Sequence, residues 1–123
     1  MGYFIIKPTS NDGFMFDLVA DNNEIIATSQ TYKSVENAKI GIESIKTNCS
    51  APVEDRTIAG FEELPCSKFE IFKDVEDKFR FHLKASNGEI IAASQGYTSK
   101  ESCRKGIESV KHNAPGAEIK KGY

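Results

Sequence analysis

The sequence contains no tryptophan, two histidines and only three cysteines among its 123 residues. Cys49, Cys66 and Cys103 are odd in number and show no C-x-x-C spacing, which excludes a disulfide framework and a zinc signature and favours reduced thiols. No apolar run approaches the ~20 residues of a membrane span. The run at Tyr3–Ile6 is also too short for a signal peptide. These absences predict a soluble cytoplasmic protein with no membrane partner.

Extremes of charge and composition are missing as well. The formal net charge is −2, which gives no global attraction to nucleic acid or acidic membranes. Hydrophobic residues make up 39% and charged residues 28% of the chain, a balance typical of globular domains rather than disordered segments. The length suits one compact domain, residues 1–123, that needs no disulfide or metal to fold.

What the sequence does contain is an internal repeat. At an offset of 65 residues, segments 4–48 and 69–113 align without a gap and match at 23 of 45 positions. The similarity is clearest between NNEIIATSQTYKSVENAKIGIESIKTN and NGEIIAASQGYTSKESCRKGIESVKHN. Such similarity indicates tandem duplication, so the two copies give two readings of one structural unit.

Each copy predicts three strands. The segments Phe14–Ala20 and Phe79–Ala85 alternate Phe, Leu and Ala with other residues, the period of a half-buried strand. Turns rich in Asn and Gly follow, at Asp21–Asn23 and Ser86–Gly88. Shorter apolar segments supply the first and third strands of each copy, at Tyr3–Lys7, Glu24–Thr28, Lys68–Lys73 and Glu89–Ala93.

One amphipathic helix follows the strands in each copy. Ser34 and Ser99 are the predicted N-caps, each with a glutamate in the first turn. Helical spacing then places Ala38, Ile42 and Ile45, and likewise Cys103, Ile107 and Val110, on one apolar stripe. Gly41 and Gly106 beside the stripes are expected to let helix and sheet approach closely, and Asn48 and Asn113 are predicted left-handed caps.

A fourth strand completes each copy, because a structureless stretch of 20 residues after the first helix is improbable in a compact domain. Pro52–Ile58 and Gly116–Gly122 are the candidates. The predicted fold class is therefore α+β: two tandem β-β-β-α-β repeats, 3–58 and 68–121, joined by a linker at 59–67. The repeats are expected to form one pseudo-twofold domain with an antiparallel sheet and two helices, since one repeat alone buries too little.

The run Phe79–Ala92, with Gly106–Lys111 and Asn113–Pro115, resembles the YegP-like family of uncharacterised bacterial and archaeal proteins. The resemblance covers nearly the whole chain, although Asn23 and Cys49-Ser50 depart from the family's Gly and Ala-Pro. It implies that the repeats exchange their last strands, which puts Val53–Ile58 beside the second repeat and Ala117–Lys121 beside the first. It implies no activity.

No catalytic, cofactor-binding or metal-binding residue is predicted. The chain has no H-E-x-x-H, G-x-S-x-G, P-loop or G-x-G-x-x-G motif. His82 and His112 have no histidine counterpart in the first copy, where Asp17 and Thr47 stand, and Cys103 lies on an apolar stripe. The acidic tip with Asp74, Glu76 and Asp77 is interpreted as a solvated turn rather than a cation site. The sequence therefore favours a protein that is not an enzyme.

Polar residues that are identical in both copies form one candidate site. They lie where the third strand ends and could serve either the turn's own hydrogen bonds or a binding patch present twice by symmetry. The candidate binding residues are Ser29, Gln30, Tyr32, Ser94, Gln95 and Tyr97. Glu43/Glu108, Ser44/Ser109 and Lys46/Lys111 on the helices are also identical, and the charged pairs can be explained by helix surface pairing.

Charge is uneven along the chain, and this gives an alternative. Residues 1–66 carry 5 basic and 10 acidic groups, whereas residues 67–123 carry 11 basic and 8 acidic groups. The two halves can attract each other or another copy of the chain. The first function hypothesis is a non-enzymatic binding or interaction module with an unidentified partner. The alternative is weak nucleic-acid binding through phosphate contacts of Arg80, Lys84, Lys100, Arg104 and Lys105.

Overall fold

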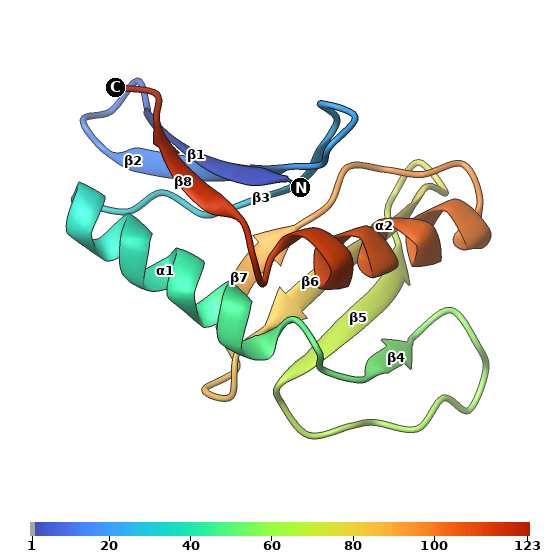
Figure 1. Cartoon of the computed structure of the whole chain (residues 1–123). Helices are drawn as coiled ribbons and strands as arrows, with labels where there is room; N and C mark the ends of the chain where they lie inside the picture. Colours follow the sequence, from blue (N-terminus) through green and yellow to red (C-terminus); the bar gives the residue numbers. More distant parts are fainter. Residues whose placement is uncertain (1) are drawn as a thin grey trace.

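The computed structural model describes residues 2–123, in which eight strands form one sheet (Figure 1). The strand order is β4-β5-β6-β7-β3-β2-β1-β8. The first repeat supplies β1 (Tyr3–Pro8), β2 (Phe14–Val19), β3 (Ile25–Thr28), α1 (Val35–Asn48) and β4 (Val53–Asp55). The second supplies β5 (Lys68–Lys73), β6 (Phe79–Lys84), β7 (Ile90–Ala93), α2 (Lys100–Asn113) and β8 (Glu118–Lys121).

The fourth strand of each repeat lies on the other repeat, so the expected exchange is confirmed. β4 runs parallel to β5, with Glu54 opposite Glu70, and β8 runs parallel to β1, with Ile119 opposite Phe4. Figure 1 shows β8 crossing from the end of α2 to the side of β1. The sheet is consequently mixed, and the prediction of an antiparallel sheet is wrong for both edges. The edge strand β4 also ends at Asp55, short of Ile58.

Turns and helix starts form as their residues dictate. Asn23 and Gly88 adopt φ values of 68° and 85° at the two hairpins, the conformation for which Asn and Gly are favoured. Ser34 and Ser99 accept backbone N–H bonds from Asn37 and Ser102, which confirms them as N-caps. The left-handed caps at the helix ends are wrong. Both terminal asparagines instead turn their side-chain amides back to the carbonyls of Ser44 and Ser109.

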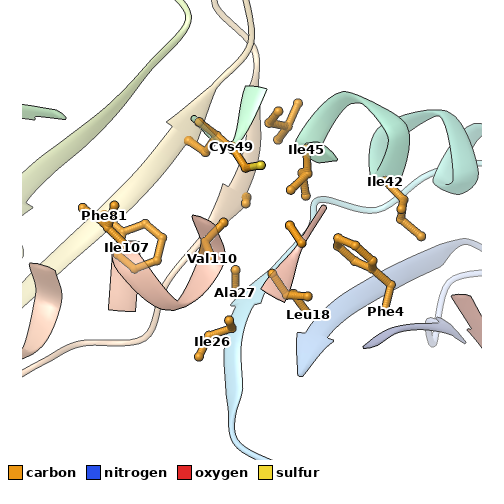
Figure 2. Close-up of a cluster of buried hydrophobic side chains, with 14 of the residues drawn as sticks. Phe4, Leu18, Ile26, Ala27, Ile42, Ile45, Cys49, Phe81, Ile107 and Val110 are labelled. Atoms are coloured by element: carbon orange, nitrogen blue, oxygen red, sulfur yellow. The ribbon is translucent and has the colours of Figure 1, made fainter. Parts of the chain in front are cut away.

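Both helices pack on one face of the sheet over a single core. Phe4, Phe16, Phe69 and Phe81 are fully buried beneath them, together with the two helix stripes. Figure 2 shows side chains from both helices and both halves of the sheet meeting in this cluster. Between the repeats, β3 and β7 share only one bridging pair, Thr28 opposite Ala93. The shared core and exchanged strands, rather than the central ladder, therefore hold the repeats together.

Candidate functional site: a groove between the repeats

The two serines of the candidate patch, which are identical in both repeats, form hydrogen bonds with the backbone. Ser29 Oγ accepts the Phe16 N–H at 2.9 Å and donates to the Gln30 carbonyl at 2.7 Å. Ser94 Oγ repeats this arrangement, accepting from the Phe81 N–H at 2.9 Å. Their hydroxyls fasten the end of the third strand to the second strand. This backbone role is sufficient to explain why serine occupies both positions.

The two tyrosines of the patch lie against the helix glycines. A Cβ atom built on Gly106 would lie 2.5 Å from Tyr97 Oη, and one on Gly41 would overlap Tyr32 Oη. Burial raises the pKa of the Tyr97 phenol, and the charge of Glu24 raises it further against the opposing effect of Gln95. Burial likewise raises the pKa of Tyr32, where Glu89 takes the place of Glu24. Each phenol is therefore a neutral hydrogen-bonding group at pH 7.

Replacing Gly106 with alanine is expected to destabilise the protein by about 1 kcal/mol. Alanine gains about 1 kcal/mol of helix propensity, but the added methyl group overpacks against Tyr97, which costs about 1–3 kcal/mol. The double variant Gly106→Ala/Tyr97→Phe should recover part of this loss, because the nearest atom is removed. Urea unfolding of the variants measures both effects. Stabilisation by Gly106→Ala alone would contradict the close approach.

A groove passes beside Tyr97, between the β2–β3 turn and α2. It consists of two adjoining hollows of about 300 and 620 Å³ that share Ala20, Asn22, Lys105 and Ser109. We call it groove 1. The first repeat supplies one wall and the second repeat the other. The remaining lining residues are Asp21, Glu24, Ile26, Tyr97, Ser102, Gly106, Glu108, His112 and Asn113.

The repeat relates the lining of groove 1 to a second set of residues that includes Tyr32, and we call the surface they form groove 2. Most lining residues are identical at the related positions. The identical pairs are Asn22/Asn87, Glu24/Glu89, Ser109/Ser44, Glu108/Glu43, Ala20/Ala85, Ile26/Ile91, Gly106/Gly41 and Asn113/Asn48. The charge of Glu89 raises the pKa of Tyr32, as the charge of Glu24 raises that of Tyr97. Four related positions differ: Asp21/Ser86, Ser102/Asn37, Lys105/Ile40 and His112/Thr47.

The five basic candidates are not gathered on one surface. Arg80 and Lys84 lie on the sheet face away from the helices, since Phe81 and Leu83 between them are buried in the core. The other three, Lys100, Arg104 and Lys105, lie on α2, which covers the opposite face.

Four of these cations are paired with largely buried carboxylates, and the fifth, Lys105, lies 3.6 Å from the exposed Glu101. Arg80 contacts Asp74 at 2.5 Å and Lys84 contacts Glu70 at 3.2 Å. Both Lys100 and Arg104 contact Asp55, at 3.0 and 3.1 Å. Asp55 belongs to the first repeat, so the predicted attraction between the oppositely charged halves is present within one chain.

Other chemistry-bearing groups lie apart from groove 1. His82 stands on the open sheet face beside the Phe72 ring, and burial lowers its pKa. Cys49 and Cys103 are buried free thiols, and burial raises the pKa of Cys103 to about 11. Asp74 binds the backbone of its own turn. Within residues 2–123, no three His, Cys, Asp or Glu side chains are placed to hold a metal ion, and neither helix is long and apolar enough to cross a membrane.

Comparison with known proteins identifies the family that shares this architecture. A family described as a domain of unknown function, DUF1508, matches residues 10–55 and 74–120, one segment in each repeat. The chain belongs to the DUF1508 family. It is 39% identical over 119 residues to a UPF0339 protein of Acinetobacter baylyi, covering 97% of this chain and 95% of that protein. It is 37% identical over 119 residues to UPF0339 protein YegP of Escherichia coli, covering 97% and 96%.

Solved structures agree with the fold. The solution NMR structure of yegP from E. coli, a protein of unknown function, matches with a TM-score of 0.80 at 33% identity, over 98% of this chain and 91% of that chain. A UPF0339 protein of Methanosarcina acetivorans is 62% identical over 53 residues, which is 43% of this chain but 91% of that protein. The relatives of this chain thus include a protein of one-repeat length, and the resemblance to the YegP-like family is confirmed.

The sequence predicts two residues of groove 1 as site residues, Tyr97 in the binding patch and Lys105 as a phosphate contact, but not the rest of the groove. Asn22, Glu24 and Asn113 were identical in both repeats yet were interpreted only as turn, strand and cap residues. The internal match was the available signal, because all three, like Ser109, recur at the related positions. What was lacking was the spatial step that brings Glu24 of one repeat to Tyr97 of the other.

Proposed function

We propose that the protein is a non-enzymatic binding module whose binding surfaces are groove 1 and groove 2. The supporting observation is that polar residues identical in both repeats converge from opposite repeats on the same hollow. Glu24 comes from the β2–β3 turn, whereas Tyr97 and Ser109 come from the second repeat. The free thiols of Cys49 and Cys103 support a reducing, cytoplasmic setting for this role.

The chemical character of groove 1 suits recognition. Its walls offer carboxylates, amides, hydroxyls and one phenol that is neutral at pH 7, over a small apolar floor of Ala20, Ile26 and Gly106. A few convergent polar groups in a concave surface fix the orientation of a ligand. Acid–base catalysis would call for a group with its pKa tuned toward neutrality, and the shift at Tyr97 runs the opposite way.

An NMR screen of small polar fragments against the ¹⁵N-labelled protein tests this function. We expect fragments to shift the amide signals of residues 20–26 and 102–113 more than those of other segments. Ser102→Trp, which fills groove 1, should abolish these shifts. Asn37→Trp at the related position in α1 is the matched control and should leave them unchanged. Fragments that bind elsewhere, or binding that survives Ser102→Trp, would refute the assignment of groove 1.

Nucleic-acid binding is the weaker candidate, because ion pairs already offset the charge of Arg80, Lys84, Lys100 and Arg104. Surface cations act on phosphates by releasing counterions, so such binding falls steeply with salt. Because these cations are already paired, we expect the fluorescence anisotropy of labelled single-stranded DNA and RNA to stay constant as the protein is added, at both low and physiological salt. Saturable, salt-sensitive binding that is lost in Arg80→Glu/Arg104→Glu would restore this alternative.

A further inference from the structure

Among the four lining positions at which grooves 1 and 2 differ, one exchanges a lysine for an apolar residue. Lys105 lines both hollows of groove 1, whereas the related residue in α1 is Ile40, with an exposed fraction of 67%. Lys105 lies 3.6 Å from Glu101, but the two side chains are 78% and 82% exposed. An ion pair this exposed to solvent contributes little free energy, so a ligand can replace Glu101 as the partner of the Lys105 ammonium group.

Groove 1 also contains carboxylates, which when ionised only accept hydrogen bonds. Glu24 and Glu108 contribute carboxylates that are kept as Glu89 and Glu43 in groove 2. Asn113, at the end of the groove, is 2% exposed and donates its amide N–H to the Ser109 carbonyl at 2.9 Å. Its Oδ1 atom has no hydrogen-bond partner among residues 2–123. This atom faces Gly2, where an added Cβ would lie 2.9 Å from it, so it is not counted among the ligand contacts.

We propose, building on the binding function above, that groove 1 takes a zwitterion of amino-acid or peptide chemistry. Its ammonium group is held by the acceptors that both grooves share, and its carboxylate is held by Lys105. Groove 2 keeps the acceptors but has Ile40 in place of the cation, so it holds the ammonium end alone. The position of Lys105 and Ile40 is therefore the specificity determinant that separates two surfaces derived from one duplicated unit.

Three matched dipeptide probes test the two charges separately: Ala-Ala, its C-terminal amide and its N-acetylated form. We expect saturable shifts of the residue 22–24 and 105–113 amides with Ala-Ala, and binding at least tenfold weaker for either modified form. Lys105→Ile should weaken Ala-Ala binding at least tenfold without changing the affinity for the amide. Conversely, Ile40→Lys should create Ala-Ala binding at residues 87–89. L-Alanine, titrated in parallel, distinguishes a free amino acid from a peptide as the source of the zwitterion.

The outcomes separate this inference from the function on which it rests. If the amide binds as tightly as Ala-Ala, or Lys105→Ile has no effect, Lys105 does not recognise a carboxylate and the inference is wrong. If neither Ala-Ala nor L-alanine binds while other fragments occupy groove 1, the zwitterion is wrong and the binding module stands. If no fragment binds in groove 1, both are wrong.

Discussion

Replacing Lys68 with methionine is expected to lower the free energy of unfolding by about 3 kcal/mol. Lys68 Nζ lies 2.8 Å from Glu54 Oε1 and 3.3 Å from Glu70 Oε2. The Glu54 side chain is fully buried, because the loop after β4 covers it and donates the Leu64 N–H at 2.7 Å. Removing the ammonium group leaves a buried carboxylate short of a partner. The loss lies at the lower end for such pairs because Arg56 still contacts Glu54 at 2.7 Å.

Chemical unfolding of three variants isolates the charge from the packing. Lys73→Met, at the exposed end of the same strand, should change stability by less than about 0.5 kcal/mol. Glu54→Met/Lys68→Met should lose less than Lys68→Met alone, because no buried charge remains unpaired. A double variant that is less stable than the single one would mean that the pair itself, rather than the stranded carboxylate, supplies the stability.

The pH dependence of the free energy of unfolding tests the Glu54 carboxyl group independently. Burial favours the neutral form, but Lys68, the Leu64 N–H and Arg56 outweigh it and hold the pKa of Glu54 at about 2, below its ordinary value of 4.5. A carboxyl with a lower pKa in the folded state stabilises fully above pH 4.5, and this contribution is lost as the pH falls toward 2. In Lys68→Met the folded pKa should be higher. The stability gap between variant and wild type should therefore narrow on acidification.

Local patterns predicted the elements because each repeat carries its own signals. The alternation of Phe14, Phe16 and Leu18 and the Ser34 cap act over a few residues, and the duplication states each of them twice. The predicted αL caps are absent because the chain stays right-handed past the helix ends, with φ of −68° at Cys49 and −65° at Ala114, and the terminal asparagine amides bond the carbonyl four residues back. Sequence periodicity does not distinguish these two uses of asparagine.

Groove 1 could not be predicted from local sequence patterns, because its residues come together only in the folded chain. Glu24 and Tyr97 lie far apart in the sequence but line one hollow, because α2 packs over β3 of the first repeat as well as over β6 of its own. The parallel direction of the edge strands follows from the same exchange, since β4 leaves its own repeat to join β5. Likewise, counting Lys100 and Arg104 as free cations overlooked Asp55, which only the exchanged strand brings to them.

Reversing the charge of Asp55 is accordingly expected to weaken the pairing of β4 with β5. Its Oδ1 accepts the Thr57 N–H at 3.0 Å and the Thr57 hydroxyl at 2.5 Å, and its Oδ2 faces Lys100 and Arg104. Burial alone would raise the pKa of Asp55, yet Thr57 and Lys100 lower it to about 2. Asp55→Lys would bring a third cation to this point. We expect a loss of about 2–3 kcal/mol, in the range of hydrogen bonds to charged groups.

Amide hydrogen exchange shows which strand edge loses stability in Asp55→Lys. The Arg56 N–H bonds to the Ile71 carbonyl at 2.9 Å across the β4–β5 edge, so its protection should fall in Asp55→Lys. The Gly122 N–H, bonded to Ile6 at the β1–β8 edge, should remain protected. Lys121→Asp, at the related position of β8, is the matched control because its side chain is exposed. Asp55→Lys/Lys100→Asp/Arg104→Asp restores opposite charges and should restore protection. Unchanged exchange at Arg56 in Asp55→Lys would show that backbone pairing alone holds β4 in place.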